Sequence, residues 1–402
     1  MSQMTENETD KRTLPKLPDH VSLHFMGSQG LLLDAHRQLL FSATPAATLV
    51  WCCLAEFDSR AEVLSELRQR TGLSARRAAN CIDEAVQSWR TAGLFDTPGS
   101  ALPSALPEPV EFDRDAPAPA VPTIVPSSEA AYRLLDTTFA IAFSDPTLRE
   151  AVDPVIRHLQ TAPVARPDAV LVVARDDGGF VVSQVDVGQV RCGHIDEVAP
   201  LVHTILAHAA VHRADALCAI HAGAVSVGEG CVLLAGEAGA GKSTLVSGLA
   251  AAGWRALCDD TVLLSNDTLE VRPLCGALGV KAGSWPILSD AFPELLQSPV
   301  NLRSDGRAVR YLSRNPHPLD RDRYPVHRIV FPRYDAGAGR GSLEELAPAT
   351  ALTRLMKCAY FLEHPLSPEL MERLIQWIAG IDCFEMRYAS LADSVRLFRK
   401  LD

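Results

Sequence analysis

Several features that would assign the chain to a familiar class are missing from its sequence. No Cys-x-x-Cys pair occurs among the ten cysteines, which argues against a zinc module. No run of about 18 apolar residues is present, so we expect no membrane-spanning helix. The polar N-terminus has no apolar core of a signal peptide. We therefore expect a cytoplasmic protein whose cysteines are reduced and mostly buried.

An excess of basic residues is also missing. The formal net charge is -11, whereas a general nucleic-acid or membrane binder needs a basic face. We therefore predict neither nucleic acid nor membrane as a partner. The composition, 47 % hydrophobic and 22 % charged, is that of a globular protein. With 402 residues the chain is too long for one ordinary core and predicts at least two domains.

A proline-rich segment divides the sequence. Residues 97–128 contain eight of the 27 prolines, a composition that favours extended conformations and does not build a core. We interpret this segment as a linker between a small N-terminal domain, residues 17–96, and a larger C-terminal domain, residues 129–402.

The N-terminal domain has the pattern of a hairpin followed by three helices. The apolar runs GLLLD and QLLFSA predict the hairpin. Thr44, Ser59 and Ser74 are N-cap residues ahead of helical patterns that end near 57, 72 and 93. This is the composition of a small α+β winged helix. Residues 1–100 hold 10 Lys and Arg against 12 Asp and Glu, a balance of -2, which disfavours DNA.

This domain resembles the PqqD-like peptide-binding domains of systems that modify ribosomally made peptides. The segments that carry the resemblance are LLFSATPAATLVW, EVLSELRQRTG and WRTAGLF. The resemblance implies that a precursor peptide, or another peptide or protein substrate, binds here through its leader. The leader would add as a strand to the hairpin edge and lie along a helix groove.

The sequence GEAGAGKST, residues 236–244, matches the phosphate-binding P-loop pattern. An apolar strand pattern precedes it and a helix pattern follows from Lys242 to Gly253, which is the required context. Lys242 is expected to contact the phosphates of ATP, and Ser243 to hold Mg²⁺. The predicted nucleotide-binding residues are Gly236, Glu237, Ala238, Gly239, Ala240, Gly241, Lys242, Ser243 and Thr244.

Two carboxylates and a histidine stand at fixed distances from this loop. Asp259 and Asp260 follow Lys242 by 17 and 18 residues, a gap that fits one helix and a strand running back beside the first strand. Neighbouring strand residues face opposite ways, so one Asp is expected to bind Mg²⁺ and the other to take a proton. His221 precedes Lys242 by 21 residues, on a strand of the same sheet. An exposed acidic turn and a core histidine are the plainer interpretations.

The three segments IHAGAV, GEAGAGKST and CDDTVLL together resemble the catalytic core of HPr kinase/phosphorylase and its relatives. The resemblance implies an α/β P-loop kinase domain in which Asp259 is the general base paired with His221. Asp260, with Ser243, would hold the metal. The stretch at 273–285 lacks the carboxylate of that family and has Lys281, which we predict to contact phosphate or acceptor. This departure argues against the reverse phosphorolysis reaction and against HPr as the substrate.

The sequence therefore predicts an ATP- and Mg²⁺-dependent kinase that phosphorylates a hydroxyl side chain, of Ser or Thr type, on a peptide captured by the N-terminal domain. Two alternatives stay open: a nucleotide-sensing peptide-binding protein without transfer activity, and a small-molecule kinase. A homo-oligomer is also possible. Further basic residues form either a positive patch or a solvated surface; they are Arg303, Arg307, Arg310 and Arg314.

Overall fold

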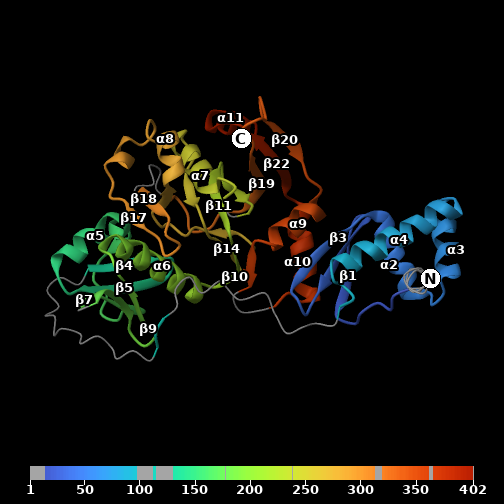
Figure 1. The fold of residues 1–402 in the computed structure, drawn as a ribbon, viewed down its shortest axis with the longest axis horizontal. Helices are drawn as coiled ribbons and strands as arrows, with labels where there is room; N and C mark the ends of the chain where they lie inside the picture. The colour runs from blue at the N-terminus through green and yellow to red at the C-terminus, as the bar shows by residue number, and fades with distance from the viewer. Residues whose placement is uncertain are drawn as a thin grey trace, which may run out of the picture. The chain divides into compact units, whose positions relative to one another are not determined.

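The protein has a mixed α/β fold with two compact units (Figure 1). The computed structural model describes residues 14–96, 112–114, 130–176, 178–237, 239–312, 319–361 and 365–401. Apart from 112–114, the predicted linker lies outside these ranges. In the described part of the chain, no helix has both the length and the apolar character that crossing a membrane would require.

The first unit begins with a three-stranded antiparallel sheet in the order β1-β2-β3. The helices that follow begin at the predicted caps, since the side chains of Thr44, Ser59 and Ser74 each accept a backbone N–H of the first turn. Strand β1 was not predicted from the sequence. The elements are β1 (Val21–Met26), β2 (Gln29–Asp34), β3 (Leu39–Ala43), α2 (Pro45–Glu56), α3 (Arg60–Thr71) and α4 (Ala75–Thr91).

Two helices from the C-terminal part of the chain complete this unit (Figure 1). They are α9 (Pro348–Met356), which contacts β2 and β3, and α10 (Pro368–Ala379), which contacts β1. One face of the sheet contributes Leu32 to the core shared with α2, α3 and α4. Leu31 and Leu33 point to the opposite face and are fully buried. On that face His24 Nδ1 donates to Glu372 of α10 at 3.1 Å.

The second unit is built around a six-stranded sheet in the order β13-β11-β12-β19-β22-β20. Strands β12 and β19 are parallel, as are β19 and β22, whereas β11 is antiparallel to both of its neighbours. Helices α7 and α11 share the hydrophobic core of this sheet. The elements are β11 (Ala222–Val227), β12 (Gly230–Ala235), α7 (Lys242–Ala251), β13 (Ala256–Cys258), β19 (Val326–Tyr334), β20 (Ser342–Glu345), β22 (Asp382–Tyr388) and α11 (Leu391–Phe398).

Three further sheets, of four, three and six strands, complete the second unit. The first, β15-β14-β10-β21, contains β10 (Ala216–Ile220), β14 (Val262–Ser265), β15 (Val271–Arg272) and β21 (Ala359–Phe361). The second, β16-β18-β17, contains β16 (Leu278–Lys281), β17 (Asn301–Leu302) and β18 (Ala308–Leu312). The third, β6-β4-β5-β7-β8-β9, contains β4 (Ala130–Leu134), β5 (Thr137–Phe143), β6 (Gln160–Thr161), β7 (Ala169–Asp176), β8 (Gly179–Gln184) and β9 (Gly188–Cys192), and its helices are α5 (Pro146–Ile156) and α6 (Ile195–Arg213).

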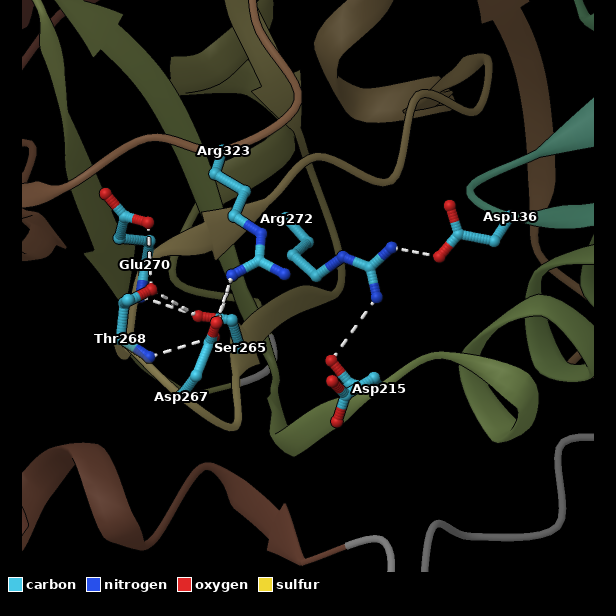
Figure 2. A network of polar contacts seen from close by, with 8 residues as sticks. All are labelled: Asp136, Asp215, Ser265, Asp267, Thr268, Glu270, Arg272 and Arg323. Atoms are coloured by element: carbon cyan, nitrogen blue, oxygen red, sulfur yellow. Dashed lines mark hydrogen bonds and ion pairs between the residues drawn. The ribbon is translucent and has the colours of Figure 1, made fainter.

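Arg272 links its own strand, β15, to two other segments of the second unit (Figure 2). Its guanidinium group donates to Asp136, between β4 and β5, and to the backbone oxygen of Asp215, just before β10. Nearby, Arg323 pairs with Asp267 in the β14–β15 turn at 2.7 Å. Arg272 is only 8 % exposed, so its hydrogen bonds to Asp136 and Asp215 are needed to offset the cost of burying its charge. The contacts of Arg272 join β15 to the start of β10 and to the β4–β5 turn. Strand β10 ends next to His221, a residue of the candidate site.

Candidate functional site

The described residues of the loop between β12 and α7 combine two glycines in the left-handed region with a helix N-terminus. Gly239 has φ +89° and Gly241 has φ +85°, a region that disfavours residues with a Cβ. Gly241 is the N-cap of α7, so the free N–H groups of the first helical turn face the loop. The sequence prediction of a strand, a glycine-rich turn and a helix is confirmed here.

Lys242 is oriented toward the loop. Its side chain is 5 % exposed, and Nζ donates to the backbone oxygens of Gly236 at 2.7 Å and of Glu237 at 2.9 Å. Burial lowers the pKa of Lys242 from its ordinary value, with the charge of Lys281 contributing. The ammonium group is thus held by neutral carbonyl oxygens at the point where phosphate oxygens would offer a stronger partner.

The other predicted nucleotide-binding residues have different surroundings. Gly239, Gly241, Ser243 and Thr244 line one large cavity together with Lys242. The hydroxyl groups of Thr244 and Ser284 are 2.6 Å apart. Gly236, Glu237 and Ala240 do not line the cavity: Glu237 is exposed, and the Ala240 oxygen accepts from the Tyr388 hydroxyl at 3.4 Å. Ala238 lies outside the described residues.

Asp259 and Asp260 both line the same cavity but differ in environment. Asp259 is partly buried and accepts the Gly279 N–H at 3.2 Å, whereas Asp260 is 60 % exposed. Burial, followed by the charge of Asp260, raises the pKa of Asp259 to about 7. The predicted placement needs a correction, because β13 pairs with β11 and not with the P-loop strand β12. One strand therefore separates the two, and the carboxylates still reach the cavity.

His221 lines the cavity too, but it lies in the bend between β10 and β11, which belong to different sheets, and not on a strand as the sequence predicted. Its Nδ1 donates to the Asp260 backbone oxygen at 3.0 Å and is 3.4 Å from Oδ1 of the same residue. The contact within the described residues is therefore with Asp260, where the family resemblance implied Asp259. Burial lowers the pKa of His221. A neutral imidazole with this bond leaves Nε2 as an acceptor facing away from the backbone.

The five basic residues singled out from the sequence, all between 281 and 314, have different surroundings. Lys281, Arg303 and Arg307 line the cavity, and the charge of Lys281 contributes to the lowered pKa values of His221 and Lys242. Arg310 is engaged elsewhere, because its guanidinium carbon lies 4.6 Å from the centre of the Trp285 ring and Nη1 donates to the Leu295 oxygen at 2.6 Å. Arg314 lies outside the described residues.

The cavity also contains residues that the sequence did not point to. His203 of α6 and Tyr311 of β18 both line it, with ring centres 5.4 Å apart. His203 is one of three histidines in α6, together with His208 and His212, and Tyr311 stands in a short strand. Neither residue is part of a motif, so no signal in the sequence identifies them as site residues.

No protein-family model matches the chain, and no curated protein sequence matches it. Its own geometry therefore carries the functional argument. Within the described ranges, no group of three or more His, Cys, Asp or Glu side chains could hold a metal ion alone. Mg²⁺ in phosphoryl-transfer sites is commonly held by one or two side-chain oxygens and the substrate phosphates. Ser243 and Asp260, both facing the cavity, fit this donor set.

Proposed function

We propose that the chain is an ATP-dependent kinase that transfers a phosphoryl group to a hydroxyl side chain of a peptide or protein. The observation that supports this most strongly is the meeting of three sequence-distant groups at one cavity. The loop and helix residues Gly239, Gly241, Lys242, Ser243 and Thr244 line it, as do the carboxylate pair and His221. A turn of glycines at a helix N-terminus binds phosphate, and a partly buried carboxylate with a pKa near 7 is suited to take a proton at neutral pH.

The residues divide the work of the reaction among them. Lys242, released from the Gly236 and Glu237 oxygens, neutralises charge on the phosphate oxygens. Asp259 accepts the proton of the acceptor hydroxyl group, whose oxygen attacks the terminal phosphorus of ATP. The bond from that phosphorus to the bridging oxygen breaks, and ADP leaves with the electron pair. His221 fixes the backbone at Asp260 through its Nδ1–H bond. Ser243 and Asp260 would hold Mg²⁺, which supplies further charge neutralisation when bound.

The first unit is proposed to capture the peptide. Within the described residues β1 and β3 each pair with β2 alone, so both edges of this small sheet have free backbone groups. Leu39 on β3 and Phe25 on β1 are exposed apolar side chains beside those edges. An extended peptide segment could pair with an edge through its backbone and place side chains on these residues.

The test of the kinase proposal is transfer itself. Purified protein, ATP, Mg²⁺ and candidate peptides encoded by neighbouring reading frames are incubated and analysed by intact-mass spectrometry for a gain of about 80 Da. Lys242→Ala and Asp259→Asn should abolish the gain, and Asp290→Asn, an exposed carboxylate outside the cavity, should leave it unchanged. Nucleotide binding without any product would refute transfer and favour a nucleotide-controlled peptide-binding protein.

A further inference from the structure

The cavity extends well beyond the phosphate loop. Its volume is about 1220 Å³, above the roughly 300–1,000 Å³ of a typical small-molecule site. One end is formed by the P-loop, the carboxylates and His221. The other end is formed by α6, β9 and the end of β4. A kinase must hold a nucleotide and an acceptor side by side, and the size of this cavity fits two ligands.

The far end is mainly apolar, unlike the phosphate end. Its apolar residues are Leu134, Val190, Pro200, Leu201, Ala207 and Val211. Thr204, His208 and Arg191, which pairs with Asp176, add polar groups. Glu197, whose side chain accepts the His194 N–H at 3.1 Å, adds a negative charge. This part of the cavity suits a triphosphate less well than the glycine loop does, because Glu197 is a like charge and the guanidinium group of Arg191 is already paired with Asp176.

His203 and Tyr311 lie where the two ends meet. Their rings contact each other at 5.4 Å between centres. Tyr311 pairs across the strands with Gly279, whose N–H donates to Asp259 at 3.2 Å, so the pair lies near the carboxylates. Burial lowers the pKa of His203 to about 4, so its imidazole is neutral at physiological pH.

The pair has hydrogen-bonding capacity to spare. Among the described residues, neither the His203 ring nitrogens nor the Tyr311 hydroxyl group has a hydrogen-bond partner in the protein. A Cβ at Gly276 would lie 2.7 Å from His203 Nε2, so glycine at this position leaves room for the ring. A neutral imidazole can donate from one nitrogen and accept at the other, which suits it to orient a hydroxyl group.

We propose that the half of the cavity formed by α6 and β9 is the acceptor compartment, and that His203 and Tyr311 position the acceptor hydroxyl group against Asp259. The acceptor is then a Ser or Thr side chain in a peptide segment with apolar neighbours. This inference rests on the proposed kinase function. His203 and Tyr311 are positioning residues here, since the proton goes to Asp259 and the phosphoryl group to the acceptor oxygen.

The first arm of the test fills the proposed acceptor compartment with a larger side chain. Ala207→Trp fills the apolar wall, and Ala336→Trp, an exposed position outside the cavity, is the matched control. The probes are a fluorescent ADP analogue with Mg²⁺, and pools of seven-residue peptides centred on Ser or Thr with apolar or charged neighbours. We expect native protein to prefer the apolar pool. Ala207→Trp should lower peptide phosphorylation at least about tenfold while nucleotide affinity stays within about twofold.

The second arm removes the hydrogen-bonding pair without adding bulk, and so remains informative if Ala207→Trp does not fold. His203→Ala should lower kcat/KM for the peptide about tenfold or more, with ATP hydrolysis to water unchanged. His203→Gln, which keeps a donor and an acceptor, should recover part of this loss. A merely structural role for His203 would lower the melting temperature and hydrolysis together, with no recovery by Gln, and would overturn the positioning role.

The remaining outcomes also decide the question. Loss of nucleotide affinity in Ala207→Trp would assign the compartment to the nucleoside and overturn the proposal. Preference for charged peptides, or ATP hydrolysis with no peptide phosphorylated, would overturn the acceptor class. Failure of the native protein to bind nucleotide at all would instead refute the kinase function on which the inference rests.

Discussion

Asp259 gives the site a pH dependence with a defined direction. The carboxylate acts as a base only when it is deprotonated, and its pKa is about 7. We expect kcat/KM for transfer to rise with pH through 7 and to level above it, falling about tenfold per unit on the acid side. Rates measured from pH 5.5 to 9 test this. A rate that is flat across pH 7 in native protein would refute Asp259 as the base.

Asp259 should also make the folded state less stable at high pH than at low pH. The folded pKa of about 7 is above the ordinary value of 3.8, so the folded state binds a proton that the unfolded state releases. The stabilising contribution is therefore complete below pH 3.8 and is lost as pH rises through 7. Asp259→Asn should raise stability relative to native protein at pH 8, by on the order of 1–2 kcal/mol, and should have little effect at pH 4. Thermal unfolding at both values checks this, with Asp290→Asn as the control.

A substitution at Gly241 tests the proposal that the backbone of the glycine loop binds phosphate. Its φ is +85°, and an added Cβ would lie 2.8 Å from the Tyr388 hydroxyl oxygen. Gly241→Ala should therefore weaken binding of MgADP about tenfold or more, because the strained turn moves its N–H groups. Gly253→Ala, at φ +109° with nothing within 4 Å of the added atom, is the control for strain alone. Calorimetric titration of both variants measures the difference, and equal affinities would contradict a cradle at Gly241.

At the scale of elements, the buried face of the first sheet depends on α9 and α10. Leu33 is fully buried on the face turned away from α2, α3 and α4. Leu33→Ala should lower the free energy of unfolding by about 2–4 kcal/mol. Leu39→Ala, whose side chain is 38 % exposed, should change it by less than about 0.5 kcal/mol. Denaturant titration distinguishes the two, and equal effects would mean that α9 and α10 do not cover this face.

Arg272 and Arg323 form a second matched pair (Figure 2). Arg272 is 8 % exposed and bonds two segments, so Arg272→Met should cost about 1–3 kcal/mol of stability. Arg323 has 38 % of its side chain exposed and pairs with Asp267 on the surface, so Arg323→Met should cost less than about 1 kcal/mol. Urea unfolding curves measure the loss of stability in each variant. The prediction is wrong if Arg272→Met costs no more stability than Arg323→Met.

The elements show which parts of the structure can be predicted from sequence. Helix caps such as Thr44 and Ser59, and the glycine turn at Gly241, are local signals, and the structure confirms them. The pairing of β13 with β11 and the position of His203 at the cavity depend on contacts between distant segments. Local pattern contains no information about such contacts. Sequence therefore predicted the glycine turn, the carboxylate pair and His221, which all reach one cavity, and missed the residues of α6 and β9 that also line it.

At the scale of the molecule, the first unit draws on three separate stretches of sequence: 14–96, 347–357 and 365–380. A protease site placed between residues 97 and 111 should therefore cut the chain without releasing the N-terminal fragment. The fragment remains bound because α9 and α10 cover its sheet. Size-exclusion chromatography of the cut protein in native buffer tests this. Elution of a separate N-terminal fragment would show that the contact is weak.

The interleaved course of the chain also bears on how such a protein could diversify. Exchange of residues 14–96 by a single recombination event would place a foreign sheet against α9, which contacts β2 and β3, and against α10, which contacts β1. Point substitutions along the strand edges, where we propose that a peptide binds, would leave these contacts in place, whereas replacement of the whole module would not.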